Sequence, residues 1–105
     1  MTLKKKNNPH VGGSLSELIE RRKARSPEFA RLYDEELEKL ALARQLRELR
    51  ESQNLSQAEL ATRVGTKQPA IARIESGKVL PRLDLLHKIA LALGMRLEIR
   101  FAKQA

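Results

Sequence analysis

Two side chains near the middle of the sequence have the chemistry needed to recognise base pairs. Gln68 carries an amide that can bind N6 and N7 of adenine, and Arg73 carries a guanidinium that can bind O6 and N7 of guanine. Each such two-point contact discriminates against a wrong base by about 1 to 3 kcal/mol. The apolar residues Ile71 and Ile74 predict the buried side of a short helix. The pattern therefore predicts an exposed helix face that could contact base edges in the major groove.

Residues 56 to 78 carry the signals for two short helices joined by a tight turn. Ser56 and Glu59 have the spacing of a capping box, which predicts the start of the first helix. Gly65 can adopt a positive φ and is expected to end this helix, and Thr66 is the expected N-cap of the second. Two helices that cross at such a turn form a helix-turn-helix motif, whose second helix enters the major groove of DNA.

The start of the second helix would face the bases, and basic or amide side chains around it would bind phosphates. The predicted base-facing residues are Lys67, Gln68, Pro69, Ala72 and Arg73. The predicted phosphate contacts are Gln57, Lys67, Lys78 and Arg82. The alternative is that Gln68 and Arg73 are merely exposed helix positions. Capping, turn and charge together favour DNA binding.

Glu75 is an acidic residue on the same predicted helix, where its charge would repel phosphate. We therefore expect its carboxylate to turn back and pair with an arginine, either Arg50 or Arg63. Such a pair would give Glu75 a structural role.

The charge of the chain is strongly positive and unevenly distributed. The 105 residues include 21 Lys and Arg against 13 Asp and Glu, a formal net charge of +8, which favours an anionic partner. From Leu40 onward there are 12 basic and 6 acidic residues, whereas residues 14 to 39 have 6 basic and 7 acidic ones. A solvated charged surface is the alternative that charge alone leaves open. The distribution places the positive excess with the helix-turn-helix motif.

Composition limits the class of protein further. Hydrophobic residues make up 41% of the chain but aromatic ones only 3%, which is usual for a small helical bundle. There is no cysteine, and His10 and His87 lie far apart, so no disulfide, metal or cofactor is expected. No nucleophile with an adjacent base is recognisable, so we predict that the protein is not an enzyme. The lack of a long apolar run or a signal core predicts a cytoplasmic protein.

The amino-terminal region divides into an arm and two helical stretches. Residues 1 to 13 combine basic residues with Asn, Pro and Gly, which predicts a flexible basic arm. Ser14 and Glu17 form a second capping box, which predicts a short helix. Ser26 followed by Pro27 marks the start of another helix, because proline fits the first helical position.

The helix that begins at Pro27 combines an apolar stripe with acidic side chains. No Gly or Pro interrupts it before Asn54, so it could be one rod of about 40 Å or break near Leu40. The stripe could pack on its own bundle. We favour partner binding, because the helices from Leu42 onward can close a DNA-binding bundle without it. Residues 14 to 40 are thus predicted to be partner-binding helices, with the candidate contacts Phe29, Leu32, Tyr33, Glu36, Leu37 and Leu40.

The end of the chain changes from helical to alternating periodicity. A helix is expected from Arg82 to Leu93, ended by Gly94, and the next residues alternate apolar and charged like a half-buried strand. A lone strand needs a partner for its backbone hydrogen bonds, and the same strand of a second copy is the simplest source. We therefore predict a two-fold homodimer suited to inverted-repeat double-stranded DNA, with the interface residues Met95, Leu97, Ile99 and Phe101.

The motif residues resemble a known family. The sequence LSQAELATRVGTKQPAIARIESGK, followed by PRLDLLHKIALALG, resembles the phage repressor and Cro-like (XRE) helix-turn-helix domain over roughly Leu42 to Gly94. The resemblance implies a five-helix-type bundle of the lambda-repressor kind. Together with the alternating pattern at the end of the chain, the expected fold is mainly α, a five-to-six-helix bundle with a C-terminal β-strand that pairs in a dimer. It places at the family's operator-contacting positions Gln57, Thr66, Lys67, Gln68 and Arg73. The expected parts are the arm (1–13), the partner-binding helices (14–40), the DNA-binding domain (41–94) and the dimerisation strand (95–105).

Segments in and around this domain are similar to HigA-like antitoxins of type II toxin-antitoxin modules. They are SPEFARLYDEELEKL, QPAIARIESGK and LGMRLEIRF. The resemblance implies a RelE/HigB-like ribonuclease toxin, blocked by the amino-terminal region, and repression of the module's own operon. The expected function is therefore an antitoxin that is also a sequence-specific autorepressor. The alternative is a stand-alone XRE-family repressor, in which the helices of residues 14 to 40 only add to the dimer and bind no toxin.

Overall fold

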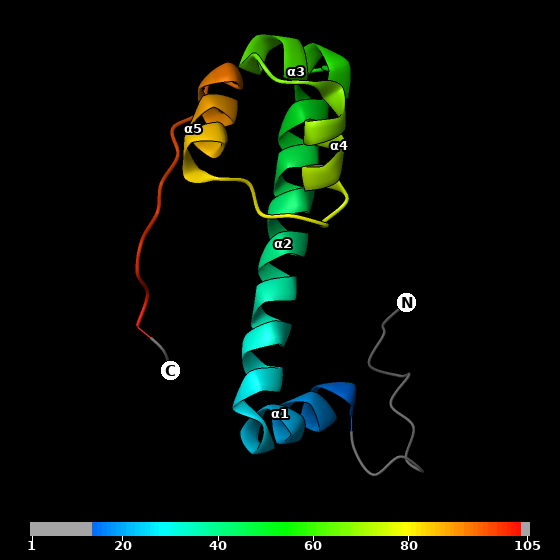
Figure 1. Ribbon diagram of the computed structural model, residues 1–105, viewed down its shortest axis with the longest axis vertical. Helices are drawn as coiled ribbons and strands as arrows, with labels where there is room; N and C mark the ends of the chain where they lie inside the picture. The colour runs from blue at the N-terminus through cyan, green and yellow to red at the C-terminus, as the bar shows by residue number, and fades with distance from the viewer. Residues whose placement is uncertain (1–13, 104–105) are drawn as a thin grey trace. The chain divides into compact units, whose positions relative to one another are not determined.

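The computed structural model describes residues 14 to 103, which form five α-helices (Figure 1). The helices are α1 (Leu15–Arg25), α2 (Pro27–Ser52), α3 (Gln57–Val64), α4 (Gln68–Glu75) and α5 (Leu83–Ala92). The chain divides into two compact units, with the boundary between Glu36 and Leu37. The predicted mainly-α fold is confirmed, whereas the predicted basic arm lies outside the described residues. Within residues 14 to 103, no helix combines the length and apolar character needed to cross a membrane.

In the first unit, both helices begin with a serine cap. The Oγ of Ser14 accepts from the N–H of Glu17 at 3.2 Å, and the Glu17 carboxylate accepts from the N–H of Ser14 at 3.1 Å. This capping box confirms the predicted start of α1. The Oγ of Ser26 accepts from the N–H of Phe29 at 3.1 Å. Pro27 then occupies the first position of α2, where no backbone donor is needed.

α2 is one continuous helix of 26 residues. Of the two alternatives, the uninterrupted helix is therefore correct. From Leu37 onward α2 belongs to the second unit, where it buries Ala43 and Leu46.

The hydrophobic core of the second unit is formed by α2, α3, α4 and α5. Leu60 of α3, Ile71 and Ile74 of α4 and Ile89 of α5 are its largest fully buried side chains. The rest of the buried cluster consists of Leu46, Leu55, Ala61 and Leu93. Helices of eight residues are marginal on their own in water, so packing against this core stabilises α3 and α4.

The turn between α3 and α4 differs by one residue from the prediction. Ser56 and Glu59 form the predicted capping box, with contacts of 2.8 and 3.0 Å, and Gly65 ends α3 with a φ of 85°. However, Thr66 is not the N-cap of α4. Its N–H donates to the carbonyl of Ala61 at 2.9 Å, so Thr66 completes the end of α3. Lys67 occupies the N-cap position instead, without a side-chain cap hydrogen bond.

The segment after α5 forms no regular element in the single chain. Gly94 has a φ of 71°, which agrees with the predicted end of the helix, although α5 itself runs only to Ala92. Residues 95 to 103 are assigned neither to a helix nor to a strand. The predicted strand is therefore absent within the described part of one chain. A strand exists through its ladder of hydrogen bonds, so pairing between two copies stays a prediction.

Candidate nucleic-acid interface

The exposed side of α4 carries most of the residues predicted to contact bases. Lys67, Gln68, Pro69 and Arg73 are exposed, whereas Ile71 and Ile74 on the other side are buried. Ala72 is half-buried and so is Thr66 in the preceding turn. The sequence prediction of a face with exposed amide and guanidinium groups therefore agrees with the structure.

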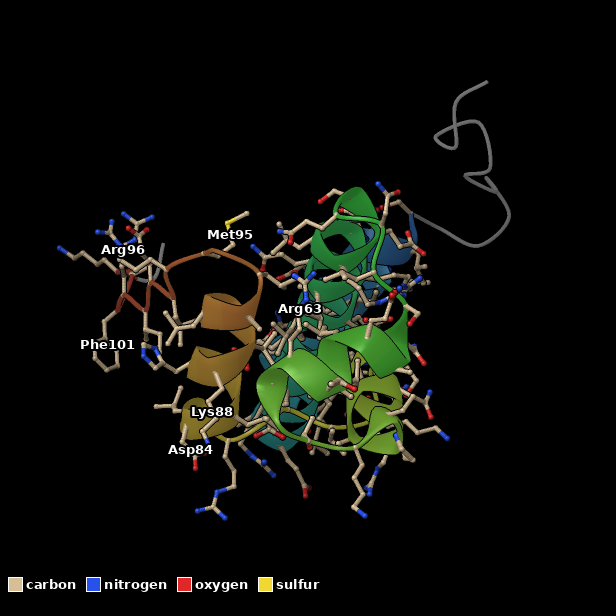
Figure 2. All side chains as sticks on the ribbon, turned by 90° about the horizontal axis from the view of Figure 1, so that it is seen from above. Arg63, Asp84, Lys88, Met95, Arg96 and Phe101 are labelled. Carbon is tan, nitrogen blue, oxygen red and sulfur yellow. The ribbon has the colours of Figure 1, made fainter. Side chains whose placement is uncertain are left out.

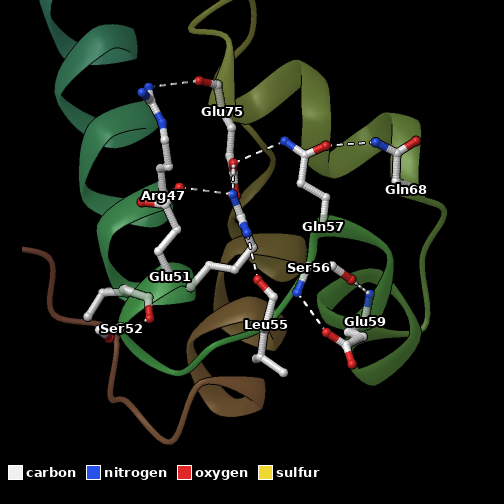
Figure 3. A network of polar contacts seen from close by, with 11 residues as sticks. Arg47, Glu51, Ser52, Leu55, Ser56, Gln57, Glu59, Gln68 and Glu75 are labelled. Carbon is white, nitrogen blue, oxygen red and sulfur yellow. Dashed lines mark hydrogen bonds and ion pairs between the residues drawn. The ribbon is translucent and has the colours of Figure 1, made fainter.

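A network of hydrogen bonds links this face to α2 and α3 (Figure 3). Glu75, which is only 6% exposed, accepts from Arg50 through both carboxylate oxygens, at 2.7 and 2.9 Å. Arg50 also donates to the carbonyl of Leu55 at 2.6 Å, and Arg47 donates to the carbonyl of Glu75 at 3.3 Å. Of the two predicted partners, Arg50 is correct and Arg63 is wrong, and Glu75 has the predicted structural position.

The same network reaches Gln68, one of the predicted base-contacting residues, through Gln57. The Nε2 of Gln57 donates to Glu75 at 3.1 Å, and the Nε2 of Gln68 donates to the Oε1 of Gln57 at 2.7 Å. An ionised carboxylate accepts but does not donate, so Glu75 fixes which end of the Gln57 amide faces it. The Oε1 of Gln57 is thereby directed to Gln68. This leaves Gln68 one N–H and its Oε1, the donor and acceptor that pairing with adenine requires.

Ionisation of Glu75 is favoured by its surroundings. Burial raises the pKa of this carboxyl, but hydrogen bonds from Arg50 and Gln57 and the charges of Arg50 and Arg47 lower it more. The pKa therefore lies below its ordinary value of 4.5. The hydrogen bond to Glu75 in turn raises the pKa of Arg50. Both partners are charged at neutral pH, which keeps the Gln57 amide in one orientation.

The remaining predicted phosphate contacts lie near the ends of α4 and α5. Lys78 is exposed just after α4, and Arg82 is exposed at the N-cap of α5. Arg82 and Arg73 line the same shallow depression of about 250 Å³. Gln57 is the first residue of α3, but its side chain is engaged between Glu75 and Gln68. Sequence reasoning missed this bridging position, because no local pattern reports a contact between residues on different helices.

The predicted partner-binding residues do not share one environment. In the first unit, the rings of Phe29 and Tyr33 stack with centroids 5.9 Å apart and are half-buried. Arg22 lies over the Phe29 ring at 5.0 Å and Lys23 over the Tyr33 ring at 5.5 Å, so α1 partly covers both rings. The exposed members of the set are Leu32, Glu36, Leu37 and Leu40.

Comparison with known proteins identifies the family. Residues 46–99, slightly more than half of the chain, match the model of the helix-turn-helix family HTH_3. The chain belongs to the helix-turn-helix family. It contains an XRE-type helix-turn-helix domain, and the predicted lambda-repressor type of fold is confirmed.

Relatives of this helix-turn-helix protein are known from bacteria and archaea. A protein of Haemophilus influenzae named as an uncharacterized HTH-type transcriptional regulator is 43% identical over 61 residues, which are 58% of this chain and 62% of the relative. A protein of the same name from Methanothermobacter thermautotrophicus is 47% identical over 49 residues, covering 47% of this chain and 71% of the relative. The chain thus spans less than two thirds of the Haemophilus protein.

Two solved structures resemble this helix-turn-helix protein to different extents. The restriction-modification controller protein C.AhdI from Aeromonas hydrophila has a TM-score of 0.58 and 30% identity, and the match covers 60% of this chain and 91% of that one. A chain of a toxin-antitoxin module from Streptococcus pneumoniae has a TM-score of 0.60 and 30% identity, with coverage of 91% and 100%. The second match therefore includes many residues outside the helix-turn-helix domain.

Proposed function

We propose that this regulator is the antitoxin of a type II toxin-antitoxin system. In this proposal it represses its own operon as a homodimer on inverted-repeat DNA, in the cytoplasm, and also neutralises a RelE/HigB-like ribonuclease toxin. The observation that carries the proposal is the extent of the likeness to the toxin-antitoxin chain, which covers 91% of this chain. The likeness to the restriction-modification controller covers 60%. A regulator that needed only DNA binding would not require the additional helices.

On DNA, α4 supplies the base contacts and the residues around it supply the phosphate contacts. Gln68 and Arg73 recognise bases, because both are exposed and the Gln68 amide is already oriented by Gln57. Pro69 adds an apolar contact, such as one to a thymine methyl group. The remaining members of the DNA-binding set position the domain on the backbone, and they are Gln57, Thr66, Lys67, Lys78 and Arg82.

The toxin contacts are proposed to lie on α1 and the first half of α2. Leu32 and Leu37 are each 46% exposed, and acidic residues on the same helix would complement a basic ribonuclease. Phe29 and Tyr33 would contribute through their uncovered parts, since α1 covers the rest. The full proposed set is Phe29, Leu32, Tyr33, Glu36, Leu37 and Leu40.

The proposal predicts that a small basic protein is encoded beside this chain, and the test is co-expression with that protein. The wild-type chain should relieve growth arrest by that protein, whereas the double variant Leu32→Asp, Leu37→Asp should not. Leu83→Asp is the matched control, because Leu83 is also an exposed leucine but lies on α5. All variants should retain operator binding in a mobility-shift assay. If the double variant still neutralises the toxin, the contacts lie elsewhere.

The alternative is a stand-alone XRE-family repressor without a toxin partner. It is favoured by the relatives named as HTH-type transcriptional regulators and by the match to the restriction-modification controller. The two functions separate in the same experiment. A neighbouring protein that is harmless with or without this chain, together with intact operator repression, would establish the repressor and exclude the antitoxin.

A further inference from the structure

Residues 95 to 103 follow α5 and leave most of their apolar side chains uncovered. Ile99 is 61% exposed and Phe101 is fully exposed, whereas Leu97 is half-buried. Figure 2 shows Met95 and Phe101 outside the packed helices. Large apolar side chains that alternate along a segment and are mostly exposed indicate a surface that binds another surface.

A groove of about 320 Å³ lies next to these uncovered residues, between α2, α5 and the C-terminal segment. Its apolar lining includes Leu42, Leu46, Leu49, Leu86, Ile89 and Leu97. Arg96 and Glu98 also line the groove and form an ion pair of 2.9 Å. The groove is therefore mainly apolar, with charges along the side formed by the segment.

The alternation of the segment restricts how two copies could pair antiparallel. Residues directly opposite each other in such a pair point to the same face of the sheet. Apolar residues must therefore lie opposite apolar ones, because a shift by one residue would place them opposite charges. This condition leaves only registers in which the two-fold axis passes through a residue of the segment.

The charged residues select among these registers. With the axis at Ile99, Glu98 lies opposite Arg100 of the second copy, and Leu97 lies opposite Phe101 of the second copy. With the axis at Glu98 or at Arg100, identical charges face each other, which is destabilising. Opposite charges that face each other contribute favourably.

The other three apolar centres, Met95, Leu97 and Phe101, are less favourable. An axis at Met95 would require Gly94 and the end of α5 to enter the ladder. An axis at Leu97 also pairs opposite charges, but it confines the ladder to residues 95 to 99, because Gly94 has a φ of 71° and a helix precedes it. It leaves Phe101 unpaired. An axis at Phe101 places Ile99 opposite Lys103 and Arg100 opposite Ala102 of the second copy, so among the described residues it pairs no opposite charges. The axis at Ile99 pairs Glu98 with Arg100 and Leu97 with Phe101 on both sides, and it places Met95 opposite Lys103.

We propose that two copies of the chain pair their C-terminal segments antiparallel about Ile99, and that Phe101 of each copy docks beside Leu97 of the other and covers its groove. The proposal rests on the homodimer of the proposed function, and it specifies the register and the occupant of the groove. Residues opposite each other have Cβ atoms about 5 Å apart, so Phe101 reaches the groove that Leu97 lines. Glu98, already paired with Arg96, gains Arg100 of the second copy.

Cysteine cross-linking tests the register directly, because the 105-residue chain contains no cysteine. Ile99→Cys should form a covalent dimer under mild oxidation, since residues opposite each other have Cα atoms about 4.5 or 5.5 Å apart, within disulfide range. Leu97→Cys alone should not, because its copies would be about 13 Å apart along the strands. A mixture of Leu97→Cys and Phe101→Cys chains should give the mixed covalent dimer.

The outcomes separate the register from the proposed function. Cross-linking of Leu97→Cys alone or of Glu98→Cys alone would establish a different axis and overturn the proposal. Failure of every pair, with operator binding and toxin neutralisation intact, would also overturn it while leaving the antitoxin function standing. As a second test, Glu98→Arg should abolish the dimer in size-exclusion chromatography, and the exchange Glu98→Arg with Arg100→Glu should restore it.

Fluorescence tests the occupant of the groove, because the chain contains no tryptophan. Phe101→Trp should emit at shorter wavelength in the dimer and shift to longer wavelength on dilution to monomer. Ala102→Trp is the matched control, because its side chain points to the opposite face of the segment and stays in water. If the indole of the Phe101→Trp variant has a water-like emission in the cross-linked dimer, the groove has another occupant.

Discussion

The amide of Gln68 is bonded to the amide of Gln57, with the Nε2 of Gln68 2.7 Å from the Oε1 of Gln57. Because Gln57 is itself bonded to the Glu75 carboxylate, a buried ion pair orients a side chain on the exposed face of α4. Ordering of a side chain before binding reduces the entropy lost on binding. The core and the recognition face are therefore connected by hydrogen bonds.

Loss of Gln57 should affect recognition at the base pair contacted by Gln68. Gln68→Ala should reduce discrimination at one A·T pair by about 1 to 3 kcal/mol. Gln57→Ala should reduce discrimination at the same pair by a smaller amount, because the Gln68 amide loses its orientation. Binding to operators substituted at each position measures both effects. If the losses of discrimination in the two single variants add up in the double variant, Gln57 does not act through Gln68.

Replacement of Arg73 should change the sequence preference of DNA binding, whereas replacement of Lys78 should change its overall affinity. Arg73→Ala should relax the preference at one G·C pair, because the guanidinium contacts the base. Lys78→Ala should weaken binding to all sequences alike and reduce the slope of affinity against salt by about 1, because it contacts phosphate. Titrations at several salt concentrations measure both. An equal loss on all sequences for Arg73→Ala would exclude base contact by this residue.

Replacement of Glu75 should destabilise the fold. Glu75→Gln should lower the free energy of unfolding by about 1.5 to 3 kcal/mol, because Arg50 stays buried with a weaker acceptor. Urea denaturation followed by circular dichroism measures this. Glu48→Gln, at an exposed position of α2, is the matched control and should change stability by less than about 0.5 kcal/mol. A similar effect of both changes would show that the buried pair contributes little.

Stability should decline at acidic pH through the same carboxyl. The pKa of Glu75 is lower in the folded state than its ordinary value of 4.5, so the unfolded state binds the proton first as pH falls. The stabilisation is therefore fully present above pH 4.5 and is lost progressively below it, as pH falls through the folded-state pKa. Urea midpoints between pH 7 and pH 3 should show this decline. The urea midpoint should fall less steeply with decreasing pH in Glu75→Gln than in the wild type. Equal slopes would exclude Glu75 as the titrating group.

The sequence predicted those features that local chemistry determines. The capping boxes at Ser14 and Ser56 and the left-handed turn at Gly65 each involve only neighbouring residues. The N-cap of α4 was misplaced to Thr66, because the extra hydrogen bond at the end of α3 is not encoded in any cap signal. The choice of Arg50 over Arg63 for Glu75 required the packing of different helices.

The candidate sites could be predicted only in part, because some of their features depend on contacts between different helices. Exposure of the α4 face follows from helical periodicity, so the exposed residues of this face could be predicted without a structure. The contact between Gln57 and Gln68 joins residues 11 positions apart on separate helices. The periodicity of apolar residues within one helix cannot predict such a contact. Coverage of Phe29 and Tyr33 by α1 depends on how that helix packs on α2. The strand after Gly94 cannot form from one chain, because its hydrogen bonds need a second strand.

Gly77, in the turn after α4, lies against Leu40 of α2. It has a φ of 77°, and a Cβ placed there would lie 3.0 Å from the Cδ2 of Leu40. Gly77→Ala should therefore destabilise the fold through both backbone strain and this contact. Gly65→Ala is the matched control, because Gly65 also has a positive φ but open space at its Cβ position, and it should cost about 1 to 2 kcal/mol from strain alone.

The contribution of Leu40 can be isolated by a double-mutant cycle of urea denaturations. If the Leu40 side chain obstructs a Cβ at position 77, Leu40→Ala should recover part of the stability lost in Gly77→Ala. The expected coupling energy is at least about 0.5 kcal/mol. The pair Leu40→Ala with Gly65→Ala should be additive, because nothing lies within 4 Å of the Gly65 Cβ position. Additivity of both pairs would mean that the backbone conformation of Gly77 alone requires glycine.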